Sequence, residues 1–351
     1  MRVVDAFCGV GGMSCGFLRV SGVKVILGIE NNDKILRAWA SNTGGRAVYA
    51  TIGIDEIIWP EASPDIFVHL SPPCTALSKA RAGSATKSDV DDGLGMLRWC
   101  IELVVKKGYL NFSLENVSTA ATRAVAQEYA ALYPSLIAFG TFDSADFDTP
   151  QNRLRLIISN PNTIRLLKET PVTRLTVANA FKNAGLALPG THIKSNTNNR
   201  DGTPCMRSVH QQSFTVTSSH PLTWADAHGT TVRCLNVQES AILMGFTPTW
   251  KLPSGSRLGI HAVGNAVPPP MATAIMRCAV EAARAYTSPT TLPSPPIPPH
   301  DEIDHTLASQ HVSKHTVSYK KFQSLKRRVD ALEAHVLGAV VLESDAPSEA
   351  L

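Results

Sequence analysis

A cysteine that follows two prolines, in the stretch Ser71-Pro72-Pro73-Cys74, has the setting of a nucleophile. The apolar run 65–70 before it predicts a buried strand, and Pro72 must end that strand because proline donates no backbone hydrogen bond. Cys74 is therefore expected on a stiff loop at the carboxyl end of a strand, where open α/β sheets bind their ligands. A thiol presented there can attack a substrate. The alternative is an inert buried cysteine, the usual state of a free thiol.

A carboxylate extends this chemistry. Glu115 ends another predicted strand, at the same sheet edge as Cys74. An acid in that place can hydrogen-bond a ring nitrogen or act as a general acid. The alternative for this stretch is the N-cap region of a helix, since Asn116 and Ser118 are both good caps.

A pair of arginines lies on a third predicted strand. Residues 149–158 alternate in polarity, so Gln151, Arg153 and Arg155 share one face. Arginines beside a buried strand need anionic or hydrogen-bonding partners. They form either a polar wall that faces a base or a phosphate, or a solvated row on an edge strand.

A glycine-rich turn at residues 9–12 follows the first apolar run and opens a helix. Glycines there let a ligand approach the backbone closely. Glu30 ends the next apolar run, where a carboxylate can accept hydrogen bonds from both ribose hydroxyls. Together they predict a nucleoside-containing cofactor. The turn is neither a Walker phosphate loop nor a spaced G-x-G-x-x-G, which favours an adenosyl cofactor without a pyrophosphate over ATP or NAD.

Strand-like and helix-like segments alternate through the N-terminal half, as in a mostly parallel, doubly wound α/β sheet. The predicted strands are 2–7, 23–30, 66–70, 111–115 and 153–159, and the predicted helices are 13–21, 32–43, 95–107 and 119–133. Polar and turn-forming residues then dominate 161–229, which predicts a small, loop-rich second domain. Further helices are expected at 232–245 and 270–286.

The C-terminal region differs in composition. Six prolines in 287–300 predict a linker, and residues 318–342 predict a helix with a short heptad stripe and a basic start. That helix either self-associates or contacts nucleic acid, or it folds against the rest of the protein. We expect the catalytic part of the chain to be a monomer.

The bulk composition excludes several classes of protein. The seven cysteines are odd in number and form no CxxC pair, which argues against a disulfide framework or a zinc site and favours a reducing, intracellular compartment. No apolar run is long enough to cross a membrane, and we expect no signal peptide because the first strand begins at about Arg2. The net charge of +4 permits a polyanionic partner without requiring one.

These motifs occur in the order typical of C5-cytosine-specific DNA methyltransferases, a family that the chain resembles over residues 2–280. The matching motifs are Asp5-x-Phe7-x-Gly9-x-Gly11-Gly12, Pro72-Pro73-Cys74, Glu115-Asn116-Val117, Gln151-x-Arg153-x-Arg155, Arg233-x-Leu235 with Glu239 and Gly245-Phe246, and Gly264-Asn265-Ala266-Val267-Pro268-Pro269. The resemblance implies a Rossmann-like fold that uses S-adenosylmethionine, with a small target-recognition domain. It implies catalytic residues 1–160 plus 262–286, recognition residues 161–261, a linker 287–315 and a C-terminal helix and tail 316–351.

The resemblance also implies a reaction. Cys74 would attack carbon 6 of cytosine, so that carbon 5 can take the methyl group and S-adenosylhomocysteine is released. Glu115 would bind the N3 edge, and Arg155 would contact the base carbonyl or its sugar-phosphate. Arg153 or Arg155 would lower the pKa of the Cys74 thiol. The cytosine would be flipped out of double-stranded DNA.

The resemblance assigns further residues to the cofactor and to DNA. The expected cofactor contacts are Asp5, Phe7, Gly9, Gly11, Gly12, Glu30, Pro72, Asn265 and Val267, with no metal. Asp55 is assigned to the adenine amine, although Thr51-Ile52 fits the spacing about as well. The expected DNA contacts are Ser78, Lys79, Arg81, Gln151 and Arg233, with Lys194, Arg200, Arg207 and His210 as weaker candidates. The loop 79–93 is expected to close over the flipped base.

Two departures from the family pattern affect specificity. Thr75 replaces the usual glutamine after the nucleophile, and the recognition region is short, which predicts a short target sequence or loose specificity. Two other functions stay open. One is an RNA cytosine-5 methyltransferase of the same fold, and the other is a non-catalytic nucleic-acid-binding relative. A bacterial or archaeal cytoplasm or a virus-infected cell is the expected location.

Overall fold

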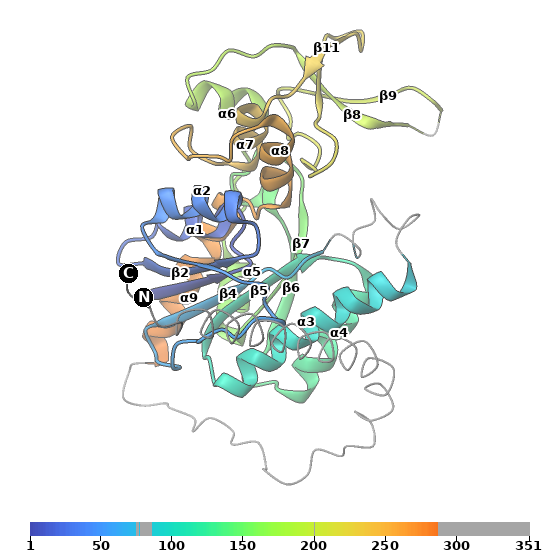
Figure 1. Ribbon diagram of the computed structural model, residues 1–351. Helices are drawn as coiled ribbons and strands as arrows, with labels where there is room; N and C mark the ends of the chain where they lie inside the picture. Colours follow the sequence, from blue (N-terminus) through green and yellow to red (C-terminus); the bar gives the residue numbers. More distant parts are fainter. Residues whose placement is uncertain (75–76, 78–85, 200, 287–351) are drawn as a thin grey trace, which may run out of the picture. The chain divides into compact units, whose positions relative to one another are not determined.

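The computed structural model describes residues 1–74, 77, 86–199 and 201–286, which belong to one compact unit (Figure 1). The predicted linker 287–315 and the helix 318–342 lie outside the described residues. So do Thr75, Ser78, Lys79, Arg81 and Arg200. Within the described part of the chain, no helix is both long and apolar enough to span a membrane.

A seven-stranded sheet forms the centre of the large domain, in the order β3-β2-β1-β4-β5-β7-β6. Its strands are β1 (Arg2–Ala6), β2 (Lys24–Glu30), β3 (Arg46–Tyr49), β4 (Ile66–Leu70), β5 (Asn111–Val117), β6 (Ala138–Asp143) and β7 (Leu154–Ser159). All pairs are parallel except β5 with β7 and β6 with β7, which are antiparallel. The predicted α/β class with a mostly parallel sheet is confirmed. The short strands β3 and β6 were not predicted.

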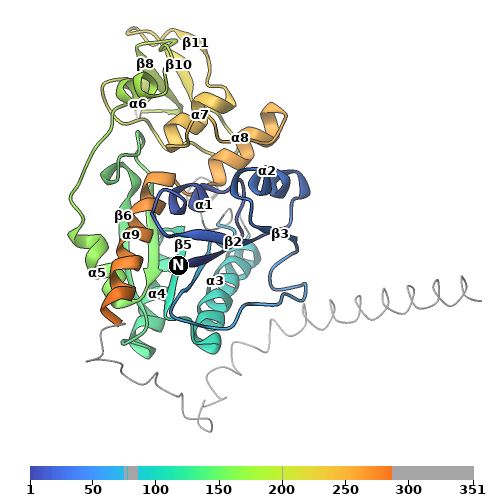
Figure 2. The same cartoon turned by 90° about the vertical axis from the view of Figure 1, so that its left-hand side faces the viewer.

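Helices cover both faces of this sheet (Figures 1 and 2). They are α1 (Gly12–Phe17), α2 (Asp33–Thr43), α3 (Lys87–Lys107), α4 (Ala120–Leu132), α5 (Pro161–Glu169) and α9 (Pro269–Tyr286). Alternate strand residues build the two cores. Val68 and Leu114 pack with α3 and α4, whereas Phe67 and Ile157 pack with α1, α5 and α9. The strands β1 and β4 are buried on both faces, which explains why they read as continuous apolar runs.

Helix α3 begins earlier than predicted, within the stretch expected to be a loop. Thr86 caps it, because its hydroxyl accepts a hydrogen bond from the Asp89 backbone while the Asp89 carboxylate accepts one from the Thr86 backbone. This reciprocal capping box fixes the start of the helix. Residues 87–93 are therefore helical. Gly93 and Gly95 had obscured the helical pattern there.

Helix α9 returns to the large sheet and packs against α1. A Cβ atom on Gly12 would lie 2.1 Å from the Val267 carbonyl oxygen, and one on Gly16 would lie 2.3 Å from the Pro269 carbonyl oxygen. Only glycine allows such a close approach of two backbones. The backbones of the glycine motif in α1 and of residues 267–269 are therefore in direct contact.

The small domain contains a four-stranded antiparallel sheet in the order β11-β10-β8-β9. Its elements are α6 (Val177–Asn183), β8 (His192–Asn198), β9 (Pro204–Ser208), β10 (Thr223–Ala225), β11 (Thr231–Cys234), α7 (Val237–Met244) and α8 (Ser256–Asn265). Trp224 and Phe181 pack edge to face at its centre, with ring centroids 5.2 Å apart. This sheet was not predicted, because β8, β9 and β11 are short, polar and largely accessible to solvent.

Candidate active site

A cavity of about 340 Å³ lies at the carboxyl ends of β1, β2, β4 and β5. It brings together Cys74, Glu115, Asp5 and Glu30, which come from four separate parts of the chain. Its volume is within the range of small-ligand sites, and its place at a sheet edge is the usual one for α/β folds. The sequence prediction that these residues meet at one edge agrees with this arrangement.

Cys74 follows β4 on the proline loop and is half-buried. Pro72 is buried and its carbonyl accepts a hydrogen bond from the Asn116 side chain at 3.2 Å. Asn116 is thus a buried strand residue rather than a helix cap. The cap of α4 is Thr119. The alternative interpretation of this stretch as an N-cap region is therefore wrong for Asn116.

Glu115 and Arg155 form a buried ion pair across the neighbouring strands β5 and β7. The distance from Arg155 Nε to Glu115 Oε1 is 2.7 Å, and the two side chains are 10% and 9% exposed. The second carboxylate oxygen, Oε2, lies 3.4 Å from the Ser71 hydroxyl. Because the pair is sheltered from water, it fixes the orientation of the Glu115 carboxylate at the cavity wall.

Arg153 points away from this pair and into the interface with the small domain. Its guanidinium donates to the carbonyl oxygens of Val216, Gly264 and Ala266 at 2.8, 2.8 and 3.1 Å. It is 4% exposed and is absent from the described lining of the cavity. Arg153 therefore joins the large domain to the small domain and to the segment before α9, and it does not touch the site as a catalytic residue would.

Gln151 is likewise a core residue. It is 0% exposed, and its amide donates to the Leu243 carbonyl at 3.0 Å and accepts from the Val216 backbone at 2.9 Å. The sequence predicts a DNA contact for Gln151, but this prediction is wrong because the side chain is fully buried. None of the three polar residues Gln151, Arg153 and Arg155 belongs to the described lining of the cavity. Arg155 is linked to it through its ion pair with Glu115, whereas the small domain covers Gln151 and Arg153.

The electrostatic setting of Cys74 differs from the expectation. Burial raises the pKa of its thiol, and the Glu115 carboxylate raises it further. Arg155 and Arg153 oppose both effects, but the pKa stays above the ordinary value. Two arginines therefore do not produce a thiolate here, because a dry site and a neighbouring negative charge outweigh them.

The glycine turn and two carboxylates form the other end of the cavity. The Glu30 carboxylate accepts hydrogen bonds from the Gly9 and Asn32 backbones at 3.1 and 2.9 Å. Asp5 is 1% exposed and accepts a hydrogen bond from the Ser14 hydroxyl at 2.5 Å. Burial raises the pKa of Asp5 to about 7. Burial also raises the pKa of Glu30.

Most of the expected cofactor residues line this cavity. They are Asp5, Phe7, Gly9, Gly12, Glu30, Pro72, Asn265 and Val267. Gly11 is not part of the lining and packs against Trp39 and Trp250 instead. Asp55 is also absent from it, because its carboxylate turns back to the Thr51 backbone at 2.6 Å. Thr51 and Ile52 line the cavity in its place.

Sequence reasoning missed Asn31, Ile35, Met96 and His261, which also line the cavity. Met96 and His261 come from α3 and α8, far from the glycine turn in sequence. Helical spacing predicts the helix that carries Met96, but not the helix α8 that carries His261, and for neither residue does it show which cavity the side chain reaches. Among the described residues, no group of three or more His, Cys, Asp or Glu side chains could hold a metal ion.

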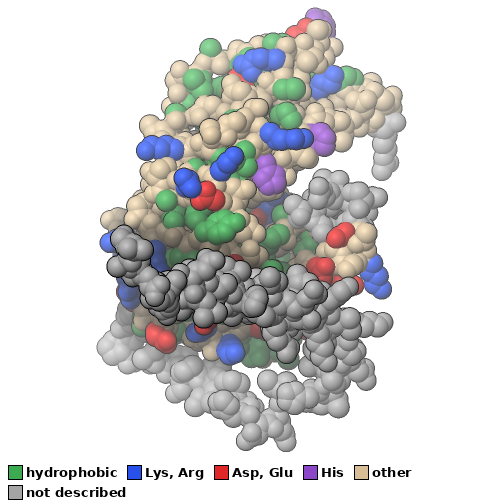
Figure 3. All heavy atoms as spheres, in the orientation of Figure 1, with side chains coloured by type: hydrophobic (Ala, Val, Ile, Leu, Met, Phe, Trp, Pro, Cys, Tyr) green, Lys and Arg blue, Asp and Glu red, His purple; other side chains and the backbone are tan. Residues whose placement is uncertain are grey.

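The expected DNA contacts of the small domain are partly engaged in other interactions. Arg233 is 45% exposed and donates to both carboxylate oxygens of Glu239 at 2.8 and 2.7 Å. Arg207 stacks on the Phe214 ring at 4.3 Å and donates to Asn152. Lys194 is partly exposed and His210 is exposed. Figure 3 shows Lys, Arg and His side chains spread over the visible face of this domain.

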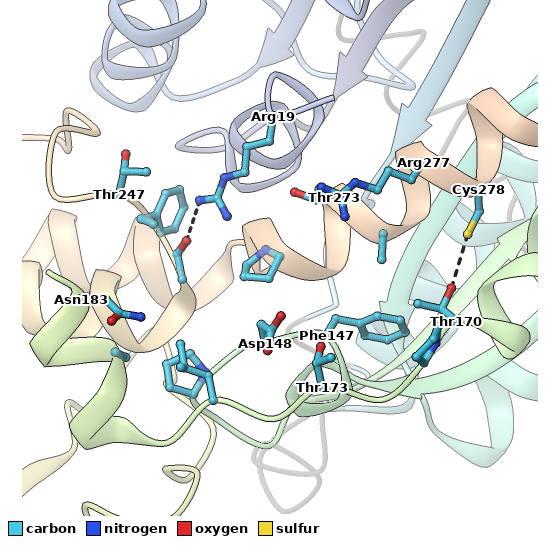
Figure 4. A pocket seen from close by; sticks show the side chains of 18 of the residues that line it. Arg19, Phe147, Asp148, Thr170, Thr173, Asn183, Thr247, Thr273, Arg277 and Cys278 are labelled. Carbon is cyan, nitrogen blue, oxygen red and sulfur yellow. Dashed lines mark hydrogen bonds between the residues drawn. The ribbon is translucent and has the colours of Figure 1, made fainter. Parts of the chain in front are cut away.

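A larger cavity, of about 740 Å³, lies beside α9 (Figure 4). Arg19, Asp148, Thr273 and Arg277 are among its lining residues, and Arg19 donates to the Gly245 carbonyl at 2.8 Å. Neither Cys74 nor Glu115 belongs to its described lining. Size alone therefore does not identify the active site, and the smaller cavity carries the reactive groups.

Comparisons with known proteins place these features in context. The family described as C-5 cytosine-specific DNA methylase matches residues 1–160 and 162–281. The chain is 29% identical over 164 residues to the type II methyltransferase M1.ScrFI of Lactococcus lactis subsp. cremoris, and 27% identical over 164 residues to M.SsoII of Shigella sonnei. Each match covers 45% of this chain, but only 40% and 41% of the respective relative.

Solved structures share the fold. A putative DNA modification methyltransferase encoded within an E. coli prophage matches with a TM-score of 0.58 at 15% identity, covering 81% of this chain and 99% of that one. The Dnmt2 methyltransferase of S. pombe matches with a TM-score of 0.52 at 14% identity, again covering 81% and 99%. At such low identity these matches concern the fold alone.

Proposed function

Because the chain belongs to the C-5 cytosine-specific DNA methylase family, we propose that it transfers a methyl group from S-adenosylmethionine to carbon 5 of cytosine in DNA. The observation that carries this proposal is the meeting of Cys74 and the Arg155-bound Glu115 in one cavity. A nucleophile and a carboxylic acid at one sheet edge are what covalent attack on a pyrimidine ring requires.

Each residue has a role in this reaction. The Cys74 sulfur forms a bond to carbon 6, while Glu115 donates a hydrogen bond or a proton at N3, so that carbon 5 becomes nucleophilic. Bound S-adenosylmethionine supplies an electrophilic methyl group. Transfer of the carbon 5 proton to solvent water, return of the N3 proton to Glu115 and elimination of the Cys74 sulfur then restore the ring and the free enzyme. Arg155 keeps Glu115 in place and faces the base.

Base binding also provides a way to activate the thiol. In the structure the Glu115 charge contributes to the raised pKa of Cys74, and Arg153 and Arg155 oppose it. When Glu115 binds N3 of the base, its negative charge is partly neutralised and repels a Cys74 thiolate less. The positive charges of Arg153 and Arg155 remain. The nucleophile is therefore activated when the substrate is present.

The cavity suits S-adenosylmethionine by its charge. Its described lining contains the carboxylates Asp5, Glu30 and Glu115 and the single histidine His261, but no lysine or arginine. That balance favours a ligand with net positive charge, such as a sulfonium with an α-amino group. Glu30 at the end of β2 would hold the ribose, and Phe7 and Ile52 offer apolar surface to the adenine ring.

The proposed polymer substrate is double-stranded DNA with its target cytosine flipped out. Cationic side chains on the small domain support a polyanionic partner (Figure 3). The division into catalytic residues 1–160 plus 262–286 and recognition residues 161–261 belongs to this proposal, except that α5 (Pro161–Glu169) packs on the large sheet with the catalytic part. All seven cysteines are free, which supports a reducing, intracellular location.

The test is methyl transfer from labelled S-adenosylmethionine to duplex DNA and, in parallel, to transfer RNA. We expect labelled 5-methylcytosine in the duplex and a covalent adduct on 5-fluorocytosine DNA. The variant Cys74→Ser should abolish both. Labelling of transfer RNA alone would overturn the DNA assignment, and the absence of any adduct on DNA or RNA would favour a binding protein.

A further inference from the structure

A row of hydrogen-bonded polar side chains leads from the interior of the large sheet to Glu115. The Ser113 hydroxyl lies 2.8 Å from His69 Nδ1, and His69 Nε2 lies 2.6 Å from the Ser71 hydroxyl. The Ser71 hydroxyl lies 3.4 Å from Glu115 Oε2. These four residues, Ser113, His69, Ser71 and Glu115, are called the polar row below. The other carboxylate oxygen of Glu115 is held by Arg155 at 2.7 Å.

Strand register explains how the polar row forms. His69 of β4 and Ser113 of β5 are direct partners in the parallel ladder. Successive side chains alternate between faces, so Glu115 lies on the same face as Ser113. Ser71 stands in the same relation to His69, just beyond the end of its strand. The polar row therefore follows one face of two neighbouring strands up to the cavity.

His69 is a costly residue for this place. It is 0% exposed and packs edge to face on Phe17, with centroids 5.9 Å apart. Burial lowers the pKa of its imidazole to about 3, so the ring is neutral. A neutral imidazole has one donor and one acceptor nitrogen, and the two serine hydroxyls satisfy both. A buried polar group of this kind needs complete partners to be tolerated.

The direction of the hydrogen bonds depends on Glu115. When its carboxylate accepts from Ser71, that hydroxyl can accept from His69 Nε2, and Nδ1 accepts from Ser113. When a protonated Glu115 donates to Ser71, in the absence of a base, each hydrogen bond reverses and the ring changes tautomer. The polar row fits both states of the acid without placing a charge on His69.

We propose that His69, acting through Ser71, is a positioning residue that holds Oε2 of Glu115 while Arg155 holds Oε1. The Glu115 carboxyl group then keeps one orientation before and after proton transfer to the base. Arg153 and Cys74 are the other ionisable groups whose charges act on Glu115 and Arg155. This inference rests on the proposed function, because it assigns Glu115 to the cytosine ring.

The test compares Ser71→Ala and His69→Leu in the full-length chain with Ser71→Thr, which keeps the hydroxyl. Ser159→Ala is the matched control, because it removes a buried hydroxyl of β7 that bonds the Phe112 carbonyl and not Glu115. We expect Ser71→Ala and His69→Leu to lower kcat roughly 10–100-fold, the usual effect of losing a residue that orients a reactive group. KM for DNA should stay the same, and Ser71→Thr and Ser159→Ala should keep most of kcat.

A second substrate separates positioning from general damage. The ring nitrogen of 5-azacytosine makes carbon 6 more electrophilic, so adduct formation needs less help at N3. Ser71→Ala should therefore slow the adduct on 5-azacytosine DNA much less than methyl transfer to cytosine. Equal loss on both substrates, or full activity of Ser71→Ala, would overturn the inference and leave the proposed function intact. An unmodified chain without any methyl transfer would overturn both.

Discussion

The side-chain amide of Asn116 donates to the carbonyl of Pro72 at 3.2 Å, and so ties the strand that bears Glu115 to the loop that bears Cys74. The acid and the nucleophile are therefore linked by a direct contact between their immediate neighbours. Both partners are buried, so the hydrogen bond does not compete with water. The relative position of the two reactive groups depends on it.

The variant Asn116→Ala should loosen the nucleophile loop. One hydrogen bond contributes about 1 kcal/mol, so we expect kcat to fall about fivefold. Asn111→Ala is a matched control, because that amide donates to the Pro64 carbonyl at 2.8 Å from the opposite end of the same strand. Both variants should lower the melting temperature similarly, and only Asn116→Ala should lower kcat. Equal kcat losses would refute a special role for Asn116.

The two arginines of the β7 region should separate stability from catalysis. Arg153→Leu strands three buried carbonyl oxygens, so we expect a loss of about 3 kcal/mol or more in the free energy of unfolding. Arg155→Lys keeps a positive charge beside Glu115 but loses the fixed guanidinium contact, and it should mainly lower kcat. Chemical denaturation and steady-state kinetics on both variants check this. A reversed pattern would contradict the roles assigned here.

The thiol of Cys74 should react slowly with iodoacetamide at neutral pH, because its pKa lies above the ordinary value. Glu115→Gln removes a charge that raises this pKa, so alkylation of Cys74 should become faster at the same pH. The exposed Cys234 serves as an internal reference in the same digest. Slower alkylation in Glu115→Gln, measured by mass spectrometry of the Cys74 peptide, would show that the carboxylate acts differently.

Asp5 should make the stability of the unliganded protein depend on pH. Its pKa is raised from 3.8 to about 7, so its contribution to stability is fully present below about pH 4 and is lost as the pH rises to about 7. Asp5→Asn stays neutral and should therefore gain stability over the unmodified chain in that interval, by up to about 4 kcal/mol.

Urea denaturation at pH 5 and pH 8 measures this difference. Asp65→Asn is the control, because the Arg2 ion pair lowers the pKa of that exposed carboxylate instead. It should show no gain at high pH. If Asp5→Asn behaves like Asp65→Asn, the carboxylate of Asp5 is not held in the dry environment that the structure shows.

Local signals in the sequence were enough to predict the alternating α/β fold. The apolar run before Pro72 and the glycine turn after β1 depend on nearest neighbours, so they could be recognised without tertiary contacts. Thr86 and Asp89 carried an equally local capping signal, which the glycines of α3 had masked. The small antiparallel sheet escaped prediction, because β8 and β11 are too exposed to alternate in hydrophobicity and β10 has only three residues.

The sequence by itself determined that Cys74 and Glu115 lie at one edge of the sheet, because the carboxyl ends of parallel strands meet there. It also predicted that Gln151, Arg153 and Arg155 share a strand face, but β7 begins at Leu154 and includes only Arg155 of these three. Only the tertiary structure decided that the small domain covers the first two and leaves Arg155 to Glu115. The same holds for the link from His69 to Glu115. Strand register and burial arise from contacts distant in sequence, and no local pattern contains them.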